Sequence, residues 1–172
     1  MKKSFKVIIS IFLIMFLFGC ESLSNTPTSK VEELMSKYQG LDNDIKTDID
    51  SVLNNYELTT EQEERYKKIL EKQYRNLSYE IKDDETDGDV ATVKVEIEVT
   101  DYRKVVDKVE EEYSSNPIYG TSEYIDYKLD ALEKAKDRVT YTINFTCTKN
   151  EEGNWKLDNL TNLDIEKIQG MY

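Results

Sequence analysis

Two stretches of strict alternation between apolar and polar residues constrain the fold of this chain most. The apolar members of the first stretch are Ala91, Val93, Val95, Ile97 and Val99. Those of the second are Val139, Tyr141, Ile143, Phe145 and Cys147. A period of two places all apolar side chains of a strand on one face. Such strands need helices on that face only, which predicts an antiparallel sheet in an α+β domain.

Each alternating stretch is predicted to form a hairpin with a second strand. Tyr79 and Ile81 indicate a short strand before the first stretch, and the acidic residues 83–89 between them contain the turn pair Asp87-Gly88. Residues 151–154 turn the second stretch back through Trp155 and Leu157. The sheet is therefore expected to be curved, with about four strands.

Helical periodicity predicts three helices before the sheet. Ser29 is the expected cap of the first, Asp42 or Asn43 opens the second, and Thr60 with Glu63 forms a capping box for the third. The apolar stripe of the third helix is Tyr66, Ile69, Leu70, Tyr74 and Leu77. Its outer face is assigned the ion pairs Glu61/Arg65, Glu63/Lys67 and Glu64/Lys68.

A helical insertion is predicted between the two hairpins. Asp101 caps its first helix, residues 114–120 break it, and Ser122 starts its second helix. We expect this pair to cross the sheet or to extend one rim of it. Residues 164–169 are expected to form one last helical turn.

The first 20 residues are typical of an export signal. Residues 2–6 carry three lysines, and residues 7–18 are apolar apart from Ser10, which is too short to span a bilayer as a helix. The sequence Leu17-Phe18-Gly19-Cys20 resembles the lipobox of bacterial lipoproteins. The resemblance implies cleavage after residue 19 and a lipid on Cys20 that anchors the chain to the extracytoplasmic face of the cell membrane. An ordinary secreted protein and an uncleaved anchor are the alternatives.

Residues 20–29 are polar and are expected to form a flexible tether, which leaves 30–172 as a single α+β domain. The chain has 23 basic and 35 acidic residues, and loss of the three signal lysines takes its net charge from −12 to −15. Nucleic acids and anionic membrane surfaces bind to cationic patches. We therefore expect no nucleic-acid partner, and contact with the membrane through the lipid on Cys20.

The residue types exclude several kinds of chemistry. The chain has no histidine, so catalytic triads of the Ser-His-Asp and Cys-His kinds cannot form, and the commonest transition-metal ligand is missing. Cys147 alternates with core residues and is predicted to be buried. The acidic residues 83–89 resemble half of a calcium loop, but Lys94 stands where that loop needs a glutamate. A charged hairpin turn is favoured over weak calcium binding, and no metal or cofactor is expected.

The order of the predicted parts resembles a known fold. Helices followed by a sheet that ends in the hairpin Gly153-Asn154-Trp155-Lys156-Leu157 are similar to the cystatin-like or NTF2-like domains of Gram-positive lipoproteins of unknown function. The likeness covers residues 29–172. It implies a cone between helices and sheet that holds a small ligand or is filled by side chains. The insertion at 102–137 departs from the pattern and is expected to cover or fill the cone.

The same resemblance suggests candidate residues. Tyr102, Tyr141 and Trp155 lie on predicted inward faces and are the possible lining of a ligand pocket. NTF2-like enzymes use a tyrosine with an aspartate for proton transfer, so Tyr102 beside Asp101, or Tyr141, is a candidate for that role. Neighbouring residues at a helix start do not face one pocket, however, so packing is the preferred role and no catalytic residue is assigned.

Three functions are compatible with these patterns. The favoured one is a non-catalytic module that binds a cell-envelope ligand or protein. The alternatives are a small metal-independent acid/base enzyme of NTF2-like type and an accessory subunit of another envelope protein. A binder is expected to show an apolar pocket with few ionisable groups, an enzyme a buried carboxylate or tyrosine with a shifted pKa, and a subunit an exposed apolar patch. The interior is predicted to contain Tyr, Val, Ile and Leu, with charges outside.

Overall fold

The computed structural model describes residues 25–115 and 120–172, so the predicted export signal, Cys20 and the start of the predicted tether lie outside it. The described residues form an α+β fold, as the alternating patterns predicted. Its elements in chain order are α2 (Pro27–Gly40), α3 (Asn43–Leu53), α4 (Thr60–Arg75), β1 (Ser78–Asp87), β2 (Val90–Thr100), α5 (Tyr102–Ser115), α6 (Thr121–Lys134), β3 (Arg138–Lys149), β4 (Trp155–Leu157) and α7 (Asn162–Gln169).

The four strands form one antiparallel sheet in the order β1-β2-β3-β4. Strands β2 and β3 pair without interruption from Val90–Thr148 to Thr100–Arg138. The five apolar residues predicted for β2 are at most 1% exposed. The face assignment of β2 is therefore confirmed. In β3 the predicted face is buried from Ile143 to Cys147, while Val139 and Tyr141 are half-buried.

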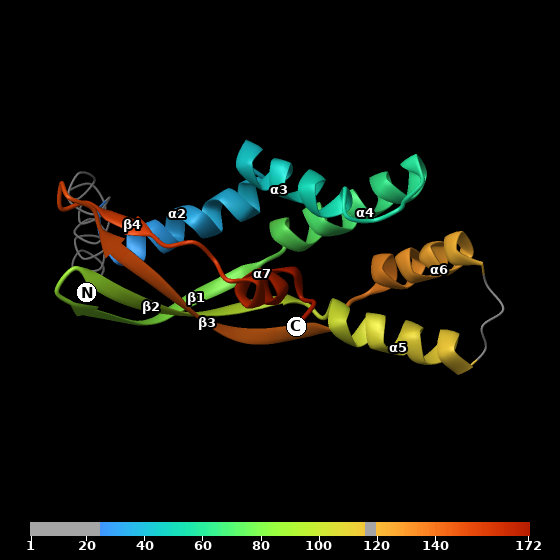
Figure 1. The fold of residues 1–172 in the computed structure, drawn as a ribbon. Helices are drawn as coiled ribbons and strands as arrows, with labels where there is room; N and C mark the ends of the chain where they lie inside the picture. Colours follow the sequence, from blue (N-terminus) through green and yellow to red (C-terminus); the bar gives the residue numbers. More distant parts are fainter. Residues whose placement is uncertain (1–24, 116–119) are drawn as a thin grey trace, which may run out of the picture.

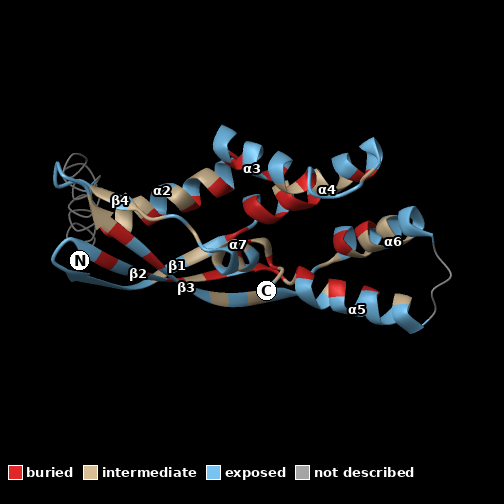
Figure 2. Ribbon diagram, in the orientation of Figure 1, coloured by how far each residue is buried: buried red, intermediate tan, exposed pale blue. Residues whose placement is uncertain are grey.

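The helices that cover the sheet lie on its apolar face only. Helix α2 contacts all four strands, α7 contacts β2, and α4 packs on α2 and α7 (Figure 1). Figure 2 shows buried residues where β2 and β3 meet these helices and exposed residues between them. The core between helices and sheet consists of Val, Ile, Leu, Tyr and Met with Ala91, Phe145 and Cys147. The buried polar side chains of the described residues are Gln62, Gln73 and Thr100, so the predicted apolar interior is confirmed.

The helical insertion extends one end of the sheet instead of crossing it (Figure 1). The Asp101 carboxylate caps α5 as predicted, accepting from the Lys104 backbone N–H at 2.9 Å. Helices α5 and α6 pack on each other, and α6 packs on α4. They bury a second, smaller cluster made of Ile69, Tyr102, Val106, Leu129 and Leu132. The insertion therefore has its own small core outside the space between the sheet and helices α2 and α7.

A fully buried glutamine connects α4, β2 and α7. The Gln73 amide donates to the backbone carbonyls of Thr100 and Gln169, both at 2.9 Å, and its carbonyl accepts from the Thr100 N–H at 3.0 Å. Gly170 follows α7 in the left-handed conformation, with φ of 70°, and its carbonyl accepts from the Arg103 N–H at 2.8 Å. Each buried polar group is thus paired, which offsets the cost of taking it out of water.

The starts of four helices differ from the prediction. Helix α6 begins at Thr121 instead of Ser122, α7 begins at Asn162 instead of Asp164, and α2 and α4 also begin at other residues. Helix α2 begins at Pro27 with Thr26 as its cap, so residues 27–29 are helical and do not belong to the tether. Proline suits this first position because its missing N–H has no partner there in any helix. Helix α4 is capped by Thr59 with Gln62, one residue before the predicted pair Thr60 and Glu63. The pairs Thr59 with Gln62 and Thr60 with Glu63 both fit the capping-box pattern, and α4 uses the first pair.

Strand β1 is longer than predicted. The acidic residues 83–87 continue the strand and pair with β2, with a register shift between Ile81 and Asp83. Their side chains are exposed, so pairing the backbone leaves the charges in solvent. The turn itself is confined to the residues around Gly88, whose φ of 61° fits the predicted Asp-Gly turn.

Candidate functional site

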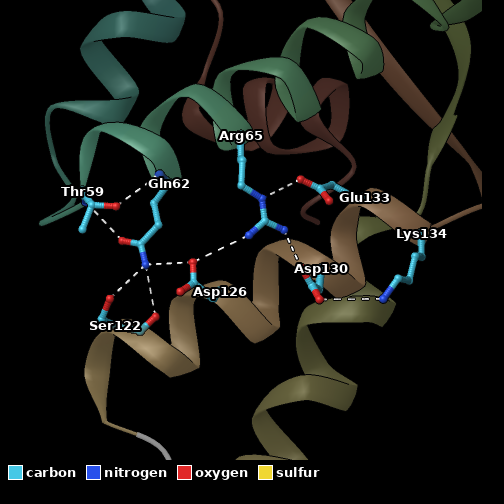
Figure 3. A network of polar contacts seen from close by, with 8 residues as sticks. All are labelled: Thr59, Gln62, Arg65, Ser122, Asp126, Asp130, Glu133 and Lys134. Carbon is cyan, nitrogen blue, oxygen red and sulfur yellow. Dashed lines mark hydrogen bonds and ion pairs between the residues drawn. The ribbon is translucent and has the colours of Figure 1, made fainter.

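An arginine holds the insertion against α4. Arg65 donates to the carboxylates of Asp130 at 2.5 Å and Glu133 at 2.8 Å, and lies 3.6 Å from that of Asp126 (Figure 3). The pairing lowers the pKa of the Glu133 carboxyl, chiefly through its hydrogen bond to Arg65. The structure places Arg65 on the face of α4 that meets α6 rather than on the outer face, so the predicted pair with Glu61 is wrong.

The cap of α4 takes part in the same contact. The Gln62 carbonyl accepts from the Thr59 backbone N–H at 3.1 Å, which completes the capping box. Its amide donates to the Ser122 hydroxyl at 3.1 Å and to the Asp126 carboxylate at 3.0 Å (Figure 3). Gln62 is 3% exposed, so these bonds are largely shielded from water. Arg65 and Gln62 together fix the position of α6 relative to α4.

An apolar groove opens where α6, α4 and the segment before α4 meet. Its volume is about 300 Å³. It is lined by Tyr56, Glu57, Leu58, Tyr66, Thr121, Tyr124, Ile125, Lys128, Leu129 and Leu132. This volume is at the lower end of the range of small-molecule sites, which are mostly apolar with a few polar groups. Two of its ten lining residues, Glu57 and Lys128, carry a charge.

Aromatic rings form much of the wall of this groove. The rings of Tyr56 and Tyr66 meet edge to face, with centroids 5.7 Å apart. Tyr56 is 52% exposed, although it is a large side chain. Tyr124 packs on Tyr113 of α5, with centroids 4.4 Å apart. Exposed aromatic surface beside a groove is available for contact with a ligand. Burial raises the pKa of the Tyr66 phenol, so this hydroxyl stays protonated near neutral pH.

The three residues predicted to line a pocket lie in different surroundings. Tyr102 is 1% exposed within the smaller core cluster, and its hydroxyl lies 3.5 Å from the Ile69 carbonyl oxygen. The Tyr141 hydroxyl donates to the carbonyl of Tyr172 at 2.8 Å. Trp155 lines a different groove, between α2 and β4, and stacks against the Lys149 ammonium at 4.8 Å.

In the part of the chain that the structure describes, no carboxylate pairs with Tyr102 or Tyr141, the tyrosines considered for proton transfer. The hydroxyls of Tyr102 and Tyr141 both point to backbone carbonyls. Burial raises the pKa of each phenol, which favours its protonated form. Asp101, which stands next to Tyr102, is used to cap α5. The structure thus does not form the proton-transfer pair that the NTF2-like resemblance suggested.

Cys147 and the acidic residues after Lys82, the two other candidates for chemistry, both serve the fold. Cys147 is fully buried on the apolar face of β3, as predicted, and burial raises the pKa of its thiol to about 11. The acidic residues 83–87 lie along β1 and form the hairpin that the sequence favoured. Among residues 25–115 and 120–172, no three acidic or cysteine side chains converge as metal ligands would.

The sequence patterns did not predict the residues of this groove as a binding site, although some of them could have indicated one. Tyr66 belongs to the predicted apolar stripe of the third helix, and Ile125, Leu129 and Leu132 recur at helical spacing in the second helix of the predicted insertion. Tyr56 and Leu58 lie in the segment between two helices, where exposed apolar residues are a hint of a binding surface. Nothing in the local pattern indicates that α6 lies beside them.

Comparison with known proteins gives little further information. No protein-family model and no curated protein matches the chain. The crystal structure of a "putative lipoprotein (ycdA)" from Bacillus subtilis is similar at 20% sequence identity and a TM-score of 0.44. The match covers 76% of this chain and 46% of that protein, so the chain spans less than half of its length. None of the helices that the structure describes is long and apolar enough to cross a membrane.

Proposed function

We propose that this chain is a lipid-anchored protein of the extracytoplasmic membrane face that binds a cell-envelope ligand in the groove between α4 and α6 without catalysing a reaction. The observation that carries the proposal is the groove itself, an apolar cavity of about 300 Å³ with two charged residues in its wall. This is the arrangement expected of a binding module and not of an acid/base enzyme, whose catalytic group needs a pKa near the working pH.

The design of the contact between α4 and α6 supports the proposal. Arg65 and Gln62 hold α6 in place through side chains that do not line the groove. The groove walls are therefore set by the fold before a ligand arrives, which lowers the entropy cost of binding. The anchor rests on the lipobox resemblance, and two acyl chains on Cys20 suffice for stable attachment to a membrane.

Replacing Cys20 with serine tests the anchor. Serine has no thiol to carry the lipid, so Cys20→Ser is expected to move from the detergent phase to the aqueous phase or to accumulate with its signal uncleaved. Phase partitioning and immunoblotting of both fractions measure this outcome. The control is Cys147→Ser, which leaves the lipidation residue intact. Retention of Cys20→Ser in the detergent phase at the wild-type level would contradict the anchor.

A truncated groove wall tests the binding role. The full-length chain, purified in detergent from its own membrane, is expected to carry a ligand that mass spectrometry of an organic extract detects. Tyr56→Ala removes an exposed ring from the wall, and we expect it to reduce the amount recovered by about tenfold, the effect of losing roughly 1.4 kcal/mol of binding free energy.

The matched control for this variant is Tyr172→Ala. Tyr172 is also 52% exposed but does not line the groove. It is expected to retain the wild-type amount of ligand. The binding proposal is wrong if the two variants lose the same amount, or if the wild-type extract contains no ligand in proportion to protein.

A further inference from the structure

A lysine in the groove wall, Lys128, finds no partner among the residues that the structure describes. Seven lysines and arginines of the described residues are half-buried, namely Lys30, Lys37, Arg65, Lys67, Lys128, Lys149 and Lys167. Lys128 is the one among them for which the described residues supply no ion pair, hydrogen bond or aromatic contact. A half-buried lysine side chain for which the described residues supply no partner stands out in a chain with 35 acidic residues.

The other six cations show how consistently this protein pairs such groups. Five of them form ion pairs with carboxylates at distances from 2.5 to 3.8 Å. The sixth, Lys167, donates to the Thr142 carbonyl at 3.0 Å and lies over the Tyr172 ring. Within the described part of the chain, Lys128 is thus a cationic donor without a partner, in the wall of a mostly apolar groove.

We infer that the groove takes a small organic anion, with an apolar or aromatic body among the tyrosine and aliphatic side chains and a single carboxylate paired with Lys128. This inference rests on the proposed function and specifies the class of ligand. A carboxylate supplies the opposite charge for the ammonium of this half-buried lysine, and a charge-assisted hydrogen bond between the two is stronger beside apolar side chains than in bulk water.

The second charged residue of the wall does not favour a cationic ligand. Glu57 is exposed, so water solvates its carboxylate and screens its attraction to a ligand. Glu57 and Lys128 also form no ion pair with each other. The wall therefore presents a positive charge on a half-buried side chain and a negative charge on an exposed one, and we expect the half-buried lysine to dominate recognition.

The binding of two matched probes tests the inference. 4-Phenylbutyrate has an aromatic body and a carboxylate, and 4-phenylbutanamide has the same body without the charge. Equilibrium dialysis against the full-length chain in detergent micelles, with empty micelles as blank, measures their dissociation constants. We expect the acid to bind at least about tenfold more tightly than the amide to the wild-type chain.

Variants of Lys128 assign this difference to one residue. Lys128→Met keeps the aliphatic stem and is expected to weaken binding of the acid by about tenfold without changing that of the amide. Lys128→Arg keeps the charge and is expected to bind the acid like the wild type. The control is Lys68→Met, which removes an exposed lysine of α4 outside the groove and is expected to change nothing. Melting temperatures confirm that the variants are folded.

Three results would overturn the inference. The first is equal binding of acid and amide to the wild-type chain, and the second is unchanged binding of the acid by Lys128→Met. If Tyr56→Ala weakens both probes in either case, the groove binds apolar ligands and the proposed function stands without the anionic class. The third is no binding of either probe at millimolar concentration. In that third case the proposed binding function still stands if a ligand is recovered with the purified wild-type protein, and it fails if none is recovered.

Discussion

Gly170→Ala is expected to destabilise this protein by roughly 3–5 kcal/mol, a large fraction of the stability of a small domain. A methyl group at this position would lie 2.0 Å from the Thr100 carbonyl oxygen and 2.5 Å from the Gln73 amide nitrogen. Both atoms belong to the buried hydrogen bonds that join α4, β2 and α7, so neither can move without breaking a bond. The left-handed φ of 70° adds strain for any residue with a side chain.

The control for this variant separates the clash from the backbone strain. Gly88 and Gly153 also have positive φ, of 61° and 81°, but a methyl group there meets nothing within 4 Å. Gly88→Ala and Gly153→Ala are each expected to cost about 1–2 kcal/mol, the price of the left-handed conformation alone. Chemical denaturation of the three variants measures the difference. Equal losses at all three positions would show that the contact around Gln73 does not depend on a bare backbone at Gly170.

Val95→Asp is expected to cost more than about 4 kcal/mol and to prevent folding at physiological temperature. Val95 is fully buried in the middle of β2, facing the core beneath α2. An aspartate there loses its hydration, and no lysine or arginine is buried among the described residues to pair with it. Protonation of the carboxyl would relieve only part of this cost, because a neutral acid still leaves polar atoms unpaired.

The same substitution one residue earlier provides the control. Lys94 is exposed on the opposite face of β2 and forms no ion pair within the described residues. Lys94→Asp is expected to stay within about 1 kcal/mol of the wild type, reflecting the low strand propensity of aspartate. Thermal melts followed by circular dichroism measure both variants. Similar losses for the two would mean that the buried face of β2 has been assigned to the wrong residues.

Local periodicity predicted the elements of this fold and their buried faces. The alternation in β2 and β3 identified the core side of the sheet, since side chains two residues apart share a face in any strand. Helix ends were predicted less well, as at Thr59 and Pro27, because adjacent residues offered equally good caps. The extent of β1 was also missed, since its acidic residues 83–87 resemble a turn and become a strand by pairing with β2.

What the sequence determined by itself is therefore the face that each element buries, since that depends only on the repeat of a strand or helix. The tertiary structure alone decided what each face meets. The charge of Arg65 suggests an exposed position, yet the packing of α6 on α4 places Arg65 between the two helices, where it pairs with carboxylates of α6. The groove likewise joins Tyr56 and Tyr66 to Lys128, which are distant in the chain. Contacts between elements depend on how the whole chain packs, and no local repeat encodes them.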